Sequence, residues 1–179
     1  MRKKENSKVL NNVLTITRLA LVAAMYVALS LLIQPLGYGP IQFRISEFLV
    51  LLCFYRKDYS ISMILGCLIV NLFSPFGLYD IIFGTLATAV SVIPMYYMKN
   101  IYLAALLPVI GNGVIVGVEL YLCGEPLWFS MGSVALSEFI IIGIIGVVIF
   151  RQVFDRVPAL LKIIGCTKPI SHNKKTAEV

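Results

Sequence analysis

Six long apolar stretches, separated by short polar turns, take up most of this chain. They cover Ile16–Leu36, Ile41–Tyr55, Tyr59–Phe73, Leu78–Met98, Ile101–Cys123 and Leu127–Phe150. A helix that crosses a membrane needs about 20 apolar residues, so six spans need roughly 120. A soluble domain of 179 residues that is 59% apolar could not bury this much apolar surface in one core. The sequence therefore predicts an all-α, polytopic membrane protein with six transmembrane helices.

The polar ends and turns of the chain predict its domain organisation and orientation. The membrane domain is expected over residues 16–152, after a basic lead (1–15) and before a tail with a short amphipathic helix (153–179). The turns 37–40, 74–77 and 124–126 carry no Lys or Arg, whereas the ends and the two alternate turns hold fourteen of the 15. Because positive charge collects on the cytoplasmic side, both termini are predicted to be cytoplasmic, in a cell membrane. The charge follows topology and does not form a nucleic-acid surface.

Several enzyme classes lack their motifs in this sequence. No phosphate-binding loop of the form GxxxxGK[ST] occurs, so an ATPase site of that kind is excluded. The only histidine, His172, lies in the polar tail, which removes Ser–His catalysis and the common intramembrane zinc sites. Asp80 is alone in the apolar stretches, whereas aspartyl proteolysis needs a pair. We therefore expect no catalytic residue, metal or cofactor, and favour a binding or transport subunit without its own ATPase.

Five ionisable residues away from the basic ends and two asparagines interrupt the apolar stretches: Arg44, Glu47, Asp80, Glu119, Glu138, Asn71 and Asn112. Because polar groups are costly to bury in a membrane, each is a candidate for a functional site. At about 1.5 Å of rise per residue, all seven fall in the outer half of the membrane or near its middle. This distribution predicts a polar cavity that opens to the outside. It argues against a continuous pore or proton path, which would need polar groups throughout.

Most of these residues also have a purely structural interpretation. Arg44 and Glu47 are three residues apart on one helix face, where they can pair with each other or contact a ligand. Asp80 follows a turn and suits either a helix cap or the site, with the cap slightly favoured. Asn71 is expected to tie that turn to a neighbouring helix. Asn112 lies between two glycines and is suited to a hydrogen bond between closely packed helices.

Glu119 and Glu138 have no basic partner once Arg44 is paired. Two spare carboxylates predict a ligand that is rich in hydrogen-bond donors or positively charged. A guanine-like edge fits, because its ring N–H and amino group can bind one carboxylate in bidentate fashion. Alternatively, Glu138 is protonated and bonded to a neighbouring helix. Trp128, at an outer helix end, belongs to an interfacial aromatic belt or stacks on a flat ring.

A stripe of small residues in the first stretch, Ala20, Ala24 and Ala28, would let another helix approach closely. Six helices in fewer than 200 residues, this stripe and the missing ATPase motif resemble the substrate-binding S component of an energy-coupling factor transporter. The segments Gly39–Glu47 (GPIQFRISE) and Asn71–Gly84 (NLFSPFGLYDIIFG) resemble the QueT family of such components.

The resemblance implies a function and partners. The ligand would be a queuosine precursor, a 7-deazaguanine base such as queuine or its aminomethyl precursor, captured from outside for ATP-driven import. Ala20, Ala24 and Ala28 would contact the coupling transmembrane subunit, and two ATPase subunits would supply the energy. Two alternatives stay open: an S component for another vitamin-like molecule, and a structural or assembly membrane protein that transports nothing.

Overall fold

The computed structural model describes residues 2–33 and 43–166 of the chain. Over these residues the chain is helical and contains no strand. The predicted outer turn 37–40, the first part of the segment Gly39–Glu47 and most of the tail, with His172, lie outside the described residues.

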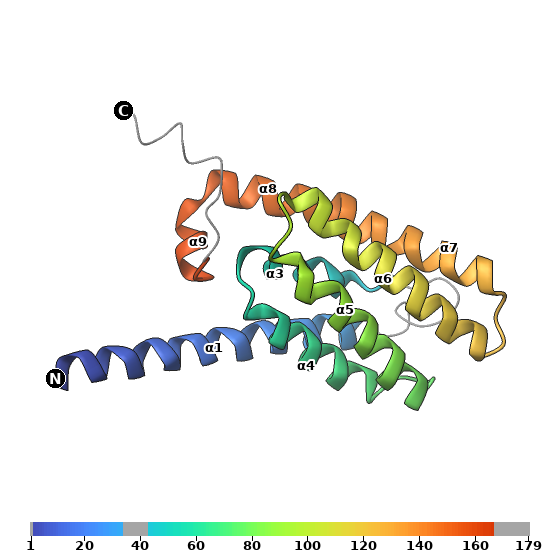
Figure 1. Ribbon diagram of the computed structural model, residues 1–179, viewed down its shortest axis with the longest axis horizontal. Helices are drawn as coiled ribbons and strands as arrows, with labels where there is room; N and C mark the ends of the chain where they lie inside the picture. The colour runs from blue at the N-terminus through green and yellow to red at the C-terminus, as the bar shows by residue number, and fades with distance from the viewer. Residues whose placement is uncertain (1, 34–42, 167–179) are drawn as a thin grey trace.

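The described elements follow one another with short turns between them (Figure 1). They are α1 (Arg2–Leu32), the 3-10 helix η1 (Ile45–Leu51), α3 (Leu52–Tyr55), α4 (Tyr59–Asn71), the π-helix η2 (Asp80–Gly84), α5 (Thr85–Met95), α6 (Ile101–Leu122), α7 (Leu127–Glu138), the π-helix η3 (Phe139–Gly146), α8 (Val147–Arg156) and α9 (Pro158–Ile163). Successive segments run in opposite directions along the long axis, and the α4–η2 and α6–α7 connections lie at the end away from α9.

Among the described residues, three helical segments are long and apolar enough to cross a membrane: Val9–Leu32, Ile101–Leu122 and Leu127–Val153. Three shorter apolar helices, Ile45–Tyr55, Tyr59–Asn71 and Asp80–Met95, correspond to the second, third and fourth predicted stretches. The prediction of an all-helical protein with apolar helices is thus confirmed. The number of spans and the orientation of the termini stay predictions.

The helix bounds differ from the predicted ones at both ends of the chain. α1 begins at Arg2, so the basic lead continues directly into the first apolar helix. At the other end, α8 continues to Arg156 and a separate helix, α9, begins at Pro158. The amphipathic tail helix predicted from residue 153 is therefore divided. Proline explains the break, because it has no backbone N–H to donate and is tolerated in a helix only at its first turn.

The helices pack in chain order, α1 on α4, α4 on α5, α5 on α6 and α6 on α7, while η1 returns to contact η3 and α1. Small residues permit the close α6–α7 contact. A Cβ added to Gly113 would lie 2.9 Å from the Cβ of Ala135, and one added to Gly117 would lie 2.8 Å from the Cα of Met131. Close packing at the glycines of this helix, including Gly113 beside Asn112, agrees with the sequence prediction.

Many large apolar side chains lie on the surface. Exposed examples on α1, α4, α5 and α6 are Leu21, Ile61, Val90, Ile93, Ile110 and Val114. A soluble monomer rarely exposes apolar surface on this scale, whereas lipid covers it at no cost. The acidic and amide side chains of the apolar stretches are buried instead: Glu47, Asn71, Asp80, Asn112, Glu119 and Glu138.

The end of α9 is held against α1 and the turn between α3 and α4. The hydroxyl of Tyr59 donates to the carbonyl of Ile164 at 2.7 Å. The Arg56 guanidinium donates to the carbonyl of Gly165 at 3.3 Å and to the Thr15 hydroxyl at 3.2 Å. These bonds join three elements at the end of the bundle opposite to the α4–η2 and α6–α7 connections.

Candidate functional site

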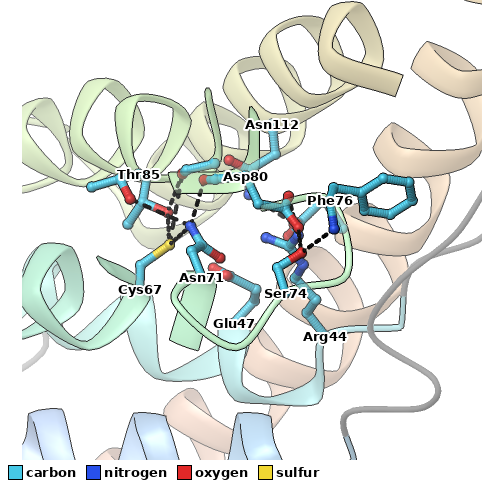
Figure 2. A network of polar contacts seen from close by, with 12 residues as sticks. Arg44, Glu47, Cys67, Asn71, Ser74, Phe76, Asp80, Thr85 and Asn112 are labelled. Atoms are coloured by element: carbon cyan, nitrogen blue, oxygen red, sulfur yellow. Dashed lines mark hydrogen bonds and ion pairs between the residues drawn. The ribbon is translucent and has the colours of Figure 1, made fainter. Parts of the chain in front are cut away.

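Buried polar residues from several elements gather into one network, part of which Figure 2 shows around Asp80 and Asn71. Arg44 immediately precedes η1, which carries Glu47, and Asp80 is the first residue of η2. Glu119 lies near the end of α6, and Glu138 is the last residue of α7. Two of these carboxyl groups thus border π-helices, whose wider turns occur often at functional sites.

Arg44 forms an ion pair with Asp80, with Nη2 and Oδ1 3.6 Å apart. The Ser74 hydroxyl donates to the other carboxylate oxygen of Asp80 and accepts from the backbone N–H of Phe76 at 3.1 Å. The ion pair of Arg44 is with Asp80. Glu47, which the spacing allowed as a partner, interacts with Arg44 electrostatically. Arg44 precedes the first turn of η1 and its backbone is not helical (φ −90°, ψ 80°), so its side chain is not fixed on the helix face that carries Glu47. Asp80 does not cap its helix through its side chain.

Glu47 has a different partner, Tyr26 of α1. The Tyr26 hydroxyl donates to Oε1 of Glu47 at 2.5 Å, and both side chains are buried. The hydroxyls of Ser30 and Ser46 lie 2.6 Å apart beside this pair. Sequence reasoning missed Tyr26, Ser30 and Ser46. A signal existed for the first two, because Tyr26 and Ser30 are four residues apart on the face of α1 that packs inward.

Asn71 ties the end of α4 to the helix that follows the turn, as the sequence suggested. Its Nδ2 donates to the backbone carbonyl of Asp80 at 2.8 Å and lies 3.3 Å from the Thr85 hydroxyl. The Cys67 sulfur is also 3.3 Å from Nδ2. This amide fixes the backbone of Asp80, and so it positions the carboxylate that faces Arg44.

Asn112 and Glu138 form a hydrogen bond between α6 and α7. The Nδ2 of Asn112 donates to Oε1 of Glu138 at 2.7 Å. The bond between helices that was expected of Asn112 is therefore present. Among the described residues, the remaining oxygens of the pair, Oδ1 of Asn112 and Oε2 of Glu138, are buried without a hydrogen-bond donor.

Glu119 is the most unusual residue of the network. Its side chain is 1% exposed, and neither carboxylate oxygen has a hydrogen-bond donor within the described part of the chain. It interacts electrostatically with Asp80 and Arg44, so it faces the same cluster. The carboxyl group of Asp80 is within interaction range of Glu119, and two acidic groups close together are costly to bury. This position therefore needs an explanation beyond packing.

Arg44 is the charge that these carboxyl groups share. It interacts electrostatically with Asp80, Glu47, Glu119 and Glu138. Among these four carboxyl groups, only that of Asp80 forms an ion pair with this guanidinium, and the other three interact with it at longer range. The buried oxygens that lack a donor are Oδ1 of Asp80, Oδ1 of Asn112, both oxygens of Glu119 and Oε2 of Glu138. The network is therefore short of donors and of positive charge, and a ligand that supplies both would complete it.

A small cavity borders the network between α1 and the start of η1. It has a volume of about 20 Å³, and its lining includes Tyr26, Ser30, Arg44 and Asn71. Such a volume holds a water molecule but not an organic ligand, for which sites of about 300 Å³ or more are usual. Binding of a larger ligand to this network therefore requires the helices or turns around it to move.

Other predicted residues lie away from the network. Trp128, in the first turn of α7, is 81% exposed, so its ring has little contact with the protein. Its role at the site stays a prediction. Ala20, Ala24 and Ala28 are exposed on α1, where another helix can reach them. In the described residues, no group of three His, Cys, Asp or Glu side chains could hold a metal ion.

Comparison with known proteins identifies relatives of the chain. A family model described as QueT transporter matches residues 16–154. The "Queuosine precursor transporter QueT" of Lactococcus lactis subsp. cremoris (strain MG1363) is 44% identical over 77 residues. This match covers 42% of the chain and 45% of the relative, so it spans less than half of that protein. No solved structure matches the chain.

Proposed function

The chain belongs to the QueT transporter family, and on this premise we propose that it is the substrate-binding subunit of an importer for queuosine precursors. Its ligand would be a 7-deazaguanine base such as queuine or its aminomethyl precursor. The single observation that carries the proposal is Glu119, a carboxyl group that is 1% exposed and has no described hydrogen-bond donor for either oxygen. A base of this kind supplies what that group lacks.

The chemistry of the base fits the network in detail. A deazaguanine presents a ring N–H beside an exocyclic amino group, and these two donors can bind one carboxylate in parallel. Hydrogen bonds to a charged acceptor contribute about 1.5–3 kcal/mol each, more than neutral ones. An anionic ligand would instead meet a network with four acidic side chains and one arginine. The network therefore favours a donor-rich base over an anionic vitamin.

The proposed import direction follows from the sequence. With six spans and both termini in the cytoplasm, the turns without Lys or Arg face outward, and the network lies nearer to them than to the basic end. The base would be captured from outside. Release into the cytoplasm would be driven by a coupling transmembrane subunit and two ATPase subunits, because the chain has no phosphate-binding loop of its own.

A ligand titration of the purified protein tests the proposed substrate. Thermal unfolding and calorimetry in detergent would use queuine, its aminomethyl and nitrile precursors, guanine and several vitamins. A ligand that binds only the folded state raises the midpoint of unfolding, so selective stabilisation by a deazaguanine supports the proposal. Stabilisation by an unrelated vitamin would indicate that the protein is an S component for that vitamin. No response from folded protein would favour a structural membrane protein.

Variants at Glu119 separate binding from folding. Glu119→Gln keeps the size of the side chain but replaces one acceptor oxygen by a donor, so we expect a loss of roughly 10-fold or more in affinity. Glu125→Gln is the matched control, because Glu125 lies in the turn before α7, outside the network. Equal binding by both variants would remove Glu119 from the site.

The coupling partner is proposed to contact the alanine stripe of α1. Ala20, Ala24 and Ala28 are exposed and lie on one face, which suits close helix contact. Ala24→Leu should reduce co-purification with the coupling subunit, whereas Ala89→Leu, at a half-buried position of α5, should not. Retention of the complex by the Ala24 variant would place the contact elsewhere.

A further inference from the structure

The acceptor atoms that lack donors fall into two groups of different chemistry. One group is the pair of carboxylate oxygens of Glu119. The other consists of Oε2 of Glu138 and Oδ1 of Asn112, which come from neighbouring helices. All three side chains are at most 5% exposed, so water cannot freely satisfy these atoms. A ligand that binds between the helices would therefore stabilise both groups of acceptor atoms by supplying hydrogen-bond donors.

The two groups lie along one face of α6. Asn112 and Glu119 are seven residues apart, which is nearly two full turns, so their side chains share a face and are separated by about 10 Å along the axis. Glu138 is held beside Asn112 by the hydrogen bond between α6 and α7. A single ligand that reaches both groups must therefore carry donors at its two opposite ends.

The geometry of each group selects a different donor. Neither oxygen of Glu119 accepts from a donor among the described residues, which suits two parallel N–H groups on a planar edge. Glu138 has one oxygen occupied by Asn112, which leaves two single acceptors on different side chains. An ammonium group matches that arrangement, because its three N–H donors point in separate directions and need separate acceptors.

The charge of the network supports a cation at the second position. Asp80 is paired with Arg44, and Glu47 accepts from Tyr26. Within the described residues, no ion pair holds Glu138, so a ligand cation would supply the opposite charge that a buried carboxylate needs.

We propose that Glu119 binds the donor edge of the deazaguanine while Glu138 and Asn112 bind a positively charged arm, so that the site selects the cationic members of this class. This inference rests on the proposed function. The aminomethyl precursor and queuine carry an amine that is protonated at neutral pH. The nitrile precursor has the same ring system and the same donor edge without a positive charge. The charged arm, and not the base alone, decides which precursor is bound.

A comparison of the aminomethyl and nitrile bases on the wild-type protein is the first test. Titration calorimetry should show roughly 10- to 100-fold tighter binding of the aminomethyl base, the effect of one or two hydrogen bonds between charged groups. Glu138→Gln should lose most of this preference and change the affinity for the nitrile base less than about threefold. Glu119→Gln should weaken both bases alike, and Glu125→Gln should change neither.

The outcomes distinguish this inference from the function on which it rests. If the wild-type protein binds neither base, the proposed function fails. If it binds both with equal affinity, the proposed function stands and the selection of a cation is overturned. The same holds if Glu138→Gln weakens both bases to the same extent. The wild-type comparison needs no variant, so it decides the question even if a substitution at Glu138 prevents folding.

Discussion

Removal of Arg44 is the perturbation to which the buried network should be most sensitive. Arg44→Met keeps an unbranched side chain of similar length but eliminates the guanidinium. Asp80 then loses the ion pair at 3.6 Å, and three further carboxyl groups lose an electrostatic attraction at longer range. Breaking a buried ion pair from one side costs about 3–5 kcal/mol, because the other charge stays buried without compensation. We expect a loss of stability of that size.

Substitution of the other partner of the ion pair, Asp80, should destabilise the protein less than Arg44→Met. In Asp80→Asn, the remaining carbonyl oxygen can still accept from the Ser74 hydroxyl, which preserves one contact of the wild-type carboxylate. Arg44 also keeps the carboxyl group of Glu119 nearby. The loss is then that of a charged hydrogen-bond partner, about 1–3 kcal/mol. The network therefore predicts an asymmetry, with the arginine more important to stability than the aspartate.

The double variant provides the decisive comparison. Asp80→Asn removes one of the negative charges that Arg44→Met leaves without compensation, so the second substitution should partly relieve the first. We expect the double variant to be more stable than the sum of the single effects by at least about 1 kcal/mol, a coupling typical of residues in direct contact. A coupling near zero would mean that the ion pair contributes little.

Thermal unfolding in one detergent, monitored by circular dichroism, measures all four proteins. For a chain of this size, 1 kcal/mol shifts the midpoint by about 2–4 °C, so Arg44→Met should melt roughly 6–20 °C below wild type. Asp80→Asn should lie between the two. An Asp80 variant at least as unstable as the Arg44 variant, together with additive effects in the double variant, would refute this account of the network.

Two further predictions concern packing and hydrogen bonding. Gly117→Ala should destabilise the protein by about 1–3 kcal/mol, because its Cβ would lie 2.8 Å from a backbone Cα of α7. The control Gly132→Ala places its Cβ in open space and should be neutral or slightly stabilising. A similar midpoint of unfolding for both variants would contradict the close contact. Tyr26→Phe removes the donor to Glu47 and should cost about 1–3 kcal/mol in thermal unfolding, while Tyr97→Phe, at a side chain that is 72% exposed, should cost almost nothing. Equal effects of the two phenylalanines would show that the buried hydroxyl is not needed.

The class of the fold and the members of the network could be predicted because lipid is a simple solvent. A polar side chain in an apolar stretch must turn inward or find a partner, so its presence alone marks it. Glu119 and Glu138 each lie within a long apolar stretch of the sequence, and both are buried in the structure. The same argument identified Asn112, whose bond to Glu138 joins two helices.

Partners within the network were not predictable in the same way. Arg44 is near Glu47 in the chain, yet it pairs with Asp80, which is on another helix. The partner of Arg44 depends on its non-helical backbone before η1 and on how Asn71 holds η2, and neither can be derived from spacing. Tyr26 was missed for a related reason. A tyrosine in an apolar helix is usually interpreted as a packing residue, and only the fold shows that the hydroxyl of Tyr26 donates to a carboxylate.

The excess of acids over bases, in contrast, is a property of the sequence that no arrangement of the helices could remove. The apolar stretches contain four acidic residues and, apart from Arg18 at their start, one arginine that lies far from the basic ends. One arginine can form a close ion pair with only some of these carboxyl groups, so others have no cationic partner. In the structure Arg44 pairs with Asp80, and Glu119 and Glu138 form no ion pair among the described residues. A buried site with this imbalance is stabilised by whatever brings donors and positive charge into it. Substrate binding and stability should therefore be coupled, and the largest ligand-induced stabilisation should come from a cationic base.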